Sequence, residues 1–334
     1  MRTITLFEHQ MRPYKELGWN LVHPLLAQIE QVNKVTGVEL VQLRHRYLKA
    51  TQFVGVIRLP SVTLQILPKI DHDGDAEAAL ESRPYHTAVQ SATRNLLHLL
   101  SYTQDIEIHE QDAAPLLARK SDWFEILTRL FAVNLHREMK RGVERAYVRK
   151  EESLGVIKGR WQLERQLTQR PHVKHIFDVI YDEFSPDTPL NRVFQFVVEH
   201  LLLRTQDRQN QRLLRDLRQW LSEVSKLGRI SHADLEAVSF TRLNKRFRPC
   251  FNLGRLFIEN RAFQLSVGVH HTFAFVFDMN RLFEEFVYRF IERHKRRVLP
   301  NSWHDLSITA KAWDRTVYLA QEIPGGQPMF RLIP

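Results

Sequence analysis

The sequence predicts an α+β protein, with a strand-rich and helical platform at its N-terminus, a mainly helical middle, and a last helix followed by strands. Three observations predict this class. Short apolar runs separated by turn residues fill positions 38–69. A helical apolar period returns repeatedly between positions 85 and 226. Strand-like stretches follow the last helix. We expect three ranges, 1–160, 161–275 and 276–334.

The platform begins with a strand at 4–7 and an amphipathic helical region at 14–32. Pro24 lies inside that region and predicts a kink or a break into two pieces, because proline lacks the N–H that a helix interior needs. Turn residues such as Pro60 and Ser61 divide positions 38–69 into three or four strands of a small sheet or barrel.

Four helices are expected after residue 69, at 85–102, 122–141, 187–204 and 209–226. The second of these ends in basic residues directly before Gly142, which is typical of a helix C-terminus. Strand-like residues occupy 143–160 and 176–181. Because no low-complexity linker separates these elements, the boundary between the first two ranges is placed near 150–175.

The last helix is predicted from Asp278, a good N-cap, and from an apolar stripe that includes Leu282 and Phe286. Glu284 falls at the edge of this stripe, whereas Glu285 falls on the solvated face with Arg289 four residues later. A carboxylate at the edge has two explanations, a partly buried ion pair, for instance with Arg281, or a metal ligand. Strand-like stretches follow at 306–312, 316–322 and 329–333.

The composition excludes a disordered chain, a collagen-like repeat protein and a small disulfide-rich protein. The 334 residues are 43% hydrophobic and 26% charged, which is ordinary for a folded protein. Lysine and arginine number 48 against 38 acidic residues, so the net charge of +10 favours a polyanionic partner without establishing one. Cys250 is the single cysteine and is expected to be a buried small hydrophobe. Without an apolar run of membrane-span length, we expect no membrane partner and a cytoplasmic location.

Nucleotide hydrolysis is not expected of this chain, because residues 155–160 contain glycines and a lysine without the spacing of a phosphate-binding loop. Five groups of residues, in order, resemble the McrC family, the nuclease subunit of modification-dependent (type IV) McrBC restriction systems. They are GVIRLP at 55–60 with LQILPKI at 64–70, RGVERAY at 141–147, IKGR at 157–160, YDEFSPDTPLNR at 181–192, and DMNRLFEEFV at 278–287.

The resemblance implies a protein in two functional parts. Residues 1–160 would dock on McrB, an AAA+ GTPase that recognises 5-methylcytosine in DNA, and would stimulate its hydrolysis of GTP, which belongs to that partner. Residues 276–334 would begin a PD-(D/E)xK nuclease that cuts double-stranded DNA with Mg²⁺. In this class a helix supplies one acid, and Glu284 matches it, as a catalytic and Mg²⁺-binding carboxylate.

The chain departs from the family pattern at its end. QPMFRLIP at 327–334 is similar to the strand that leads into the Pro-Asp acid, with Pro334 as its proline, and the Asp and the following Asp/Glu-x-Lys are not in the sequence. We therefore expect an incomplete, apparently truncated α/β nuclease core that binds no Mg²⁺ and does not cut DNA by itself. The alternative is a non-catalytic module that interacts with DNA and a GTPase.

Four basic residues are candidates for contacts with the partner or with DNA phosphates, and each also has a purely structural interpretation: Lys69, Arg141, Arg145 and Arg160. Lys69 follows an apolar run, and the three arginines are equally well explained as solvated charges near element ends. Because affinity for DNA would rest on cations at phosphates, we expect DNA binding to be weak, sequence-independent and salt-sensitive.

Overall fold

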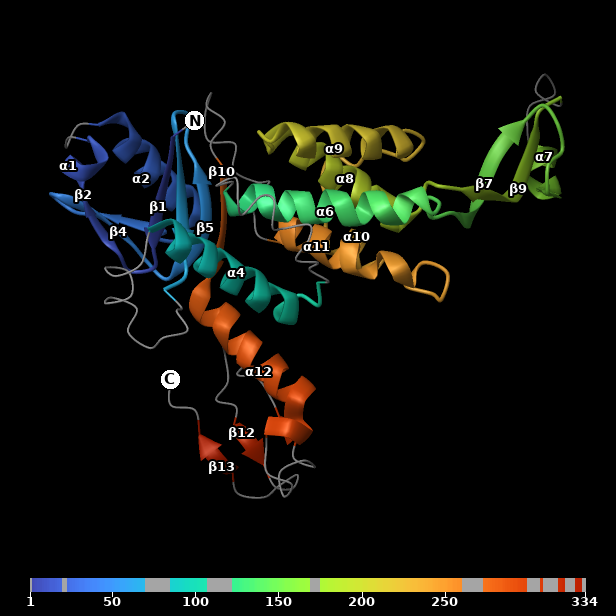
Figure 1. Ribbon diagram of the computed structural model, residues 1–334. Coiled ribbons are helices and arrows are strands. Elements are labelled where there is room, and N and C mark those ends of the chain that lie inside the picture. Colours follow the sequence, from blue (N-terminus) through green and yellow to red (C-terminus); the bar gives the residue numbers. More distant parts are fainter. Residues whose placement is uncertain are drawn as a thin grey trace. The chain divides into compact units, whose positions relative to one another are not determined.

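The computed structural model describes residues 2–19, 23–69, 85–106, 122–168, 175–259 and 273–298, with three further short strands at 307–308, 318–321 and 328–331. The chain forms two compact units, residues 1–130 with 256–334 and residues 131–255 (Figure 1). These units differ from the three expected ranges, because the chain returns to the first sheet after residue 256. Among the residues described, no helix combines the length and apolar character that crossing a membrane requires.

The first unit contains a four-stranded sheet in the order β1-β6-β5-β10. Its strands are β1 (Arg2–Phe7), β6 (Val62–Leu67), β5 (Phe53–Arg58) and β10 (Phe273–Asp278). β1 runs parallel to β6, whereas β5 is antiparallel to both β6 and β10. Every residue of β6 is buried, including the polar Thr63 and Gln65 that alternate with its apolar residues.

The remaining platform strands form a second sheet instead of extending the first. It has the order β2-β4-β3 and contains β2 (Met11–Pro13), β4 (Tyr47–Ala50) and β3 (Val41–Leu43). Four strands therefore lie within residues 38–69, as expected, and they divide between two sheets.

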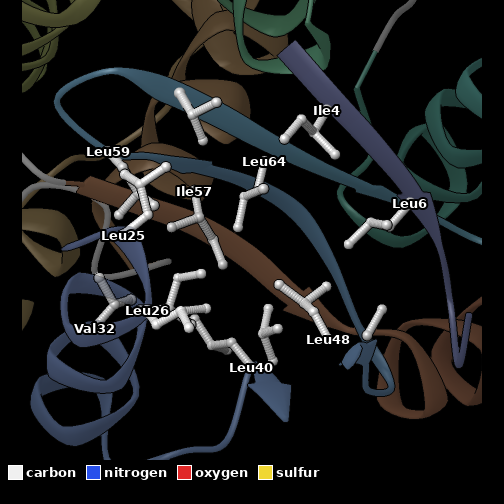
Figure 2. Close-up of a cluster of buried hydrophobic side chains, with 14 of the residues drawn as sticks. Ile4, Leu6, Leu25, Leu26, Val32, Leu40, Leu48, Ile57, Leu59 and Leu64 are labelled. Carbon is white, nitrogen blue, oxygen red and sulfur yellow. The ribbon is translucent and has the colours of Figure 1, made fainter. Parts of the chain in front are cut away.

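Pro24 separates two helices, α1 (Tyr14–Leu17) and α2 (Pro24–Thr36), so the break predicted at this proline is confirmed. Pro24 occupies the first helical position, and the ring nitrogen Nδ1 of His23 accepts a hydrogen bond from the Leu25 N–H at 3.3 Å. Figure 2 shows Leu25, Leu26 and Val32 of α2 in one cluster with side chains from both sheets. This cluster is the hydrophobic core of the platform.

Gly55 permits the pairing of β5 with β10. Its φ of +147° lies outside the range that side-chain-bearing residues favour, and a Cβ placed there would lie 2.1 Å from the carbonyl oxygen of Phe275. Only a glycine therefore lets a strand from the last quarter of the chain pair with β5 at this register.

A buried ion-pair network ties β5 to the start of α6 (Trp123–Lys140). One Nη atom of Arg58 lies 2.8 Å from the Asp122 carboxylate and 2.7 Å from the Glu125 carboxylate. Burial disfavours the Arg58 cation, but the two carboxylates outweigh this effect and raise the pKa of Arg58. Asp122 also caps α6 by accepting a hydrogen bond from the Glu125 N–H at 3.0 Å.

Two further helices of the first unit pack together, α4 (Tyr85–Thr103) and α12 (Met279–Val298). The Tyr102 ring of α4 lies 5.3 Å from Phe286 and 5.8 Å from Phe290 of α12. Asp278 caps α12, as predicted, by accepting a hydrogen bond from the Asn280 N–H at 3.0 Å. The strands β11 (Ser307–Ile308), β12 (Tyr318–Gln321) and β13 (Pro328–Arg331) follow as an antiparallel sheet.

The second unit combines a three-stranded sheet with helices. The sheet has the order β7-β9-β8, formed by β7 (Ala146–Leu154), β9 (Phe177–Ser185) and β8 (Arg160–Trp161). The helices are α7 (Leu163–Thr168), α8 (Pro189–Arg204), α9 (Arg208–Trp220), α10 (His232–Glu236) and α11 (Arg248–Glu259). Cys250 is buried, as expected, and α9 ends six residues earlier than its sequence pattern predicts.

Candidate partner-docking site

The sheet of the second unit exposes a pair of aromatic rings. β7 and β9 pair over nine residues each, and the register places Tyr147 opposite Phe184 and Arg149 opposite Asp182. The two rings are 5.2 Å apart, and Tyr147 is 75% exposed and Phe184 54%. Because alternate side chains of a strand share a face, Arg149 lies on the same face as this pair.

The opposite face of the same sheet is held together by charges. Lys150 forms an ion pair with Glu183, and the Lys158 ammonium lies 3.8 Å from the centre of the Tyr181 ring. The Lys150–Glu183 hydrogen bond raises the pKa of Lys150 and lowers that of Glu183, so both groups stay charged at neutral pH. The Tyr181 hydroxyl also donates a hydrogen bond to Glu152 at 2.7 Å. These contacts stiffen the β7–β9 strand pair that carries the exposed aromatic rings.

Gly159 brings the third strand against β9. Its φ is +71°, and a Cβ placed there would lie 2.4 Å from the carbonyl oxygen of Ile180. The close approach lets Arg160 pair with Ile180 in the backbone ladder while its own side chain stays exposed. Among the described residues, the structure gives the Arg160 guanidinium no ion-pair partner.

Exposed apolar side chains gather on this sheet and its connections. Of the 14 large hydrophobic residues that are exposed in the described part of the chain, half lie between positions 147 and 184. They are Tyr147, Val156, Ile157, Trp161, Leu163, Leu167 and Phe184. Such a concentration of exposed apolar side chains is typical of interaction surfaces.

A groove of about 510 Å³ adjoins the aromatic pair. Its walls come from residues 143–147, from the start of α8, and from the segment 237–247 that precedes α11. Arg145 lines the groove with an exposed side chain, and Leu243 at its rim is 87% exposed. The groove therefore combines a cationic group with apolar surface.

Hydrogen bonds around Glu144 hold the walls of the groove together. The Glu144 carboxylate accepts a hydrogen bond from the Thr188 hydroxyl. It accepts a second one from the Asn244 side-chain amide, at 2.9 Å. Its backbone oxygen accepts from the Asn191 amide at 2.8 Å. Three segments that are far apart in the sequence thus meet at one residue.

The loop before α8 is anchored by a second charged group. Arg192 donates two hydrogen bonds of 2.8 Å to the Asp187 carboxylate, which also accepts from the N–H and hydroxyl of Ser225 at 3.0 and 2.7 Å. The Arg192 hydrogen bonds hold the pKa of Asp187 well below its usual range. The segment YDEFSPDTPLNR therefore has a largely structural role, because it holds the loop before α8 in place.

Three of the sequence-predicted candidates, Arg141, Arg145 and Arg160, lie in this second unit. Arg141 is exposed at the end of α6 and pairs with Glu138 at 3.0 Å, as expected for a solvated helix-end charge. Arg145 lines the groove, and Arg160 lies in β8. The structure thus places two of the three at the exposed sheet.

The other two candidates, Lys69 and Glu284, lie in the first unit. Lys69 follows β6 and is half-buried, and its backbone N–H donates a hydrogen bond to the Glu8 carboxylate. This contact gives Lys69 a structural task at the end of the strand. Pro334 lies outside the described residues.

The expectation that Glu284 lies at a buried edge of α12 is wrong, because its side chain is exposed. α12 turns Phe286 and Phe290 toward α4, which leaves Phe283 46% and Val287 37% exposed beside Glu284. No ion pair joins Glu284 to Arg281 among the residues described, whereas Glu285 pairs with Arg289 at 3.0 Å as predicted.

The described residues do not gather a set of three or more metal ligands around Glu284. Mg²⁺ binds through one or two carboxylates with near-octahedral geometry. Within the described ranges, no three histidine, cysteine or acidic side chains come together in a way that could hold a metal, and Glu285 beside Glu284 is paired with Arg289. The geometry therefore gives Glu284 an accessible position without a described second ligand.

The sequence analysis did not identify Tyr147, Phe184 or Leu243 as candidate docking residues. Tyr147 and Phe184 both belong to the groups of residues that carry the resemblance, and each follows the strand alternation at an outward-facing position. An aromatic residue at an outward-facing position of a charged strand could have indicated an interface. Leu243 lies in a polar stretch, and nothing in the sequence predicts that this stretch faces residues 143–147.

A family model described as "McrBC 5-methylcytosine restriction system component" matches residues 48–313. Among solved structures, a chain of the cryo-EM structure of the Thermococcus gammatolerans McrBC complex is 27% identical, with a TM-score of 0.64 and 88% of each chain covered. A second match is to a half-complex from the tetradecameric assembly of Thermococcus gammatolerans McrB AAA+ hexamers with bound McrC. It is 27% identical, with a TM-score of 0.66 and 87% of this chain and 70% of the other covered. No curated protein matches the chain.

The fold is thus a mixed α/β fold with several small sheets, similar to that of solved McrBC subunits. The chain belongs to the family of McrBC 5-methylcytosine restriction system components, and within it the chain is a subunit of the McrC type. The resemblance stated from the five groups of residues is therefore confirmed.

Proposed function

We propose that this chain is the subunit of a 5-methylcytosine-dependent restriction complex that docks on an McrB-like AAA+ GTPase and stimulates its GTP hydrolysis. The observation that carries the proposal is the match over 87% of the chain to a structure of McrB AAA+ hexamers with bound McrC. Because the chain lacks a phosphate-binding loop, GTP belongs to the partner.

The surface proposed for docking is the face of the β7-β9-β8 sheet that carries Tyr147 and Phe184, together with the adjoining groove. Tyr147 and Phe184 supply large rigid anchors, and Arg145 supplies a cation; aromatic and arginine side chains dominate the binding energy of protein interfaces. The Lys150–Glu183 ion pair keeps the β7–β9 strand pair stiff, which lowers the entropy lost on binding.

The test is GTPase stimulation by a Tyr147→Ser/Phe184→Ser variant, mixed with the cognate GTPase. Loss of two anchors that contribute at least about 1 kcal/mol each should weaken binding at least tenfold. The matched control is Met11→Ser/Leu203→Ser, which removes two side chains that are 57% and 80% exposed outside the docking surface. Equal stimulation by the two double variants would exclude the sheet as the docking surface.

The family resemblance also leads us to propose that Glu284 is the helix acid of a nuclease core that cuts double-stranded DNA. The exposed position of Glu284 on α12, and the antiparallel strands β11, β12 and β13 after it, support this role. Because the described residues do not gather three or more metal ligands around it, Glu284 would be one ligand of a set that these residues do not complete.

Glu284→Gln, compared with Glu285→Gln, tests this second role in the assembled complex with Mg²⁺ and methylated DNA. Cutting that is lost only with Glu284→Gln, with GTPase stimulation intact in both variants, supports a nuclease. If neither the unaltered chain nor either variant cuts, the alternative of a non-catalytic module that interacts with DNA and a GTPase is favoured, and if both variants cut as the unaltered chain does, Glu284 is not the helix acid.

A further inference from the structure

The positive charge of the chain is concentrated in the second unit. Residues 131–255 contain 24 lysines and arginines against 15 aspartates and glutamates, an excess of nine within a total net charge of +10. The rest of the chain is therefore almost neutral. A polyanion that binds this protein is attracted chiefly to the second unit.

Helix α9 carries the most regularly spaced group of these charges. Its thirteen residues include Arg208, Arg212, Arg215 and Arg218. At 100° per residue, these four positions fall within an arc of about 120° on one side of the helix. The buried residues Asn210, Leu214 and Leu217 occupy the other side, and all four arginine side chains are exposed.

Acidic groups near α9 do not neutralise this face. The Asp207 carboxylate caps the helix, accepting from the Gln209 and Asn210 N–H groups at 2.9 Å each. The Asp216 carboxylate lies 3.8 Å from the His136 ring nitrogen, Nε2. Among the described residues, the structure records no ion pair for any of the four arginines; the Arg215 guanidinium is 3.5 Å from the Gln211 amide oxygen.

The spacing of the stripe fits the phosphates of a DNA strand. At 1.5 Å per residue, positions 208 and 218 are separated by about 15 Å along the helix axis. One strand of a duplex presents a phosphate about every 3.4 Å along its axis, so about four phosphates fall within this length. Arginine is also the side chain whose planar fork of donors matches phosphate oxygens.

We propose that the arginine face of α9, defined by Arg208, Arg212, Arg215 and Arg218, binds the phosphate backbone of double-stranded DNA without reading its sequence. An acidic protein surface would offer the same charge, but protein interfaces have an apolar or aromatic centre. Between these arginines, the exposed face carries only glutamine side chains, Gln211 and Gln219. The proposed function supplies DNA as a ligand, whereas the placement of this site is independent of GTPase docking.

The test measures binding of the full chain to a fluorescently labelled duplex by anisotropy, between about 50 and 200 mM salt. A variant with all four arginines changed to Gln keeps the helix propensity nearly unchanged. The slope of log K against log salt should become shallower by up to about 3.6, because each phosphate contact contributes about 0.9. The four Arg→Lys replacements should keep most of the slope, since the charge is retained.

The matched control removes the same charge from the first unit, in the variant Lys15→Gln/Lys34→Gln/Arg44→Gln/Arg46→Gln, whose four side chains are exposed. Its slope should stay close to that of the unaltered chain. Circular dichroism and thermal melting show whether the α9 variant is folded. If it is not, Arg212→Gln/Arg215→Gln replaces it, with an expected change in slope of about 1.8.

Three results would overturn the proposal. The first is an equal slope for the α9 variant and the matched control. The second is an α9 variant that binds DNA normally and fails to stimulate the GTPase, which would make the arginine face a protein-docking surface. The third is a chain that stimulates the GTPase and shows no affinity for DNA, which would refute the α9 site and leave the proposed GTPase stimulation intact.

Discussion

Replacing Arg58 by methionine should destabilise the first unit strongly, although methionine is apolar and of similar length. Arg58 is 3% exposed and gives charge-assisted hydrogen bonds of 2.8 and 2.7 Å to Asp122 and Glu125. Without the guanidinium, two carboxylates remain buried and uncompensated. Breaking a buried pair in this way costs about 3–5 kcal/mol, which is a large part of a typical folding free energy of about 5–15 kcal/mol.

The loss should depend on pH. Burial raises the pKa of the Asp122 carboxyl, and removing Arg58 takes away the cation that opposes this effect. The folded Arg58→Met variant then binds more protons than its unfolded chain, whose Asp pKa is about 3.9. Its stability is therefore highest at acid pH and falls as the pH rises above about 4, so the difference from the unaltered chain is greatest at neutral pH.

Denaturant unfolding followed by tryptophan emission provides the assay, because Trp123 is fully buried directly beside Asp122. Arg12→Met is the control: Arg12 pairs with Glu16 at 3.2 Å on the surface, and such pairs contribute about 0–1 kcal/mol. Adding Asp122→Asn and Glu125→Gln to Arg58→Met should restore much of the stability, since asparagine also caps helices. A cost for Arg58→Met no larger than that for Arg12→Met would refute this reasoning.

Three further predictions concern single residues. Gly55→Ala should prevent β10 from pairing with β5, because the added Cβ would lie 2.1 Å from the Phe275 oxygen; thermal melting should show a loss of several degrees or more, and an unchanged melting temperature would contradict the close approach. Asp187→Asn should flatten the acid side of the stability profile: the lowered pKa of Asp187 stabilises the fold fully above about pH 4, and this stabilisation is lost gradually as the pH falls from there through the lowered pKa, so the difference in urea midpoint from the unaltered chain should be greatest near pH 6 and should shrink steadily below pH 4. Thr188→Ala should cost about 1–2 kcal/mol, because it removes an N-cap whose hydroxyl also bonds Glu144; a urea midpoint within error of the unaltered chain would show that the cap is dispensable.

Local elements could be predicted because their causes are local. Pro24 begins a helix at the first helical position, where its missing N–H needs no partner, and Asp278 starts another through its side-chain oxygen. Both effects act within a few residues of the chain. The same holds for the four strands of residues 38–69, whose apolar alternation and turns are visible without any partner.

Pairing between distant strands could not be predicted in this way. Nothing in the sequence of β5 identifies β10 as its neighbour. A glycine in an apolar strand, such as Gly55, indicates only that another backbone approaches closely. The exposure of Glu284 depends likewise on which side of α12 is covered by α4, and an apolar stripe alone does not show how much of its width is buried. The groove was missed for the same reason, because Leu243 and Arg145 meet only in the folded unit.

Some residues that carry the family resemblance hold the fold together, whereas others, such as Tyr147, carry proposed contacts. Gly55 and Gly159 permit close backbone approaches, and Asp187 anchors the loop before α8. Substituting them would lower activity by disturbing the fold, so a loss of function there would not locate a binding surface. Tyr147 and the arginines of α9 have exposed side chains, and their removal leaves the described core contacts in place. Losses of GTPase stimulation or of DNA binding at these exposed positions, with unchanged stability, therefore report on the contacts themselves.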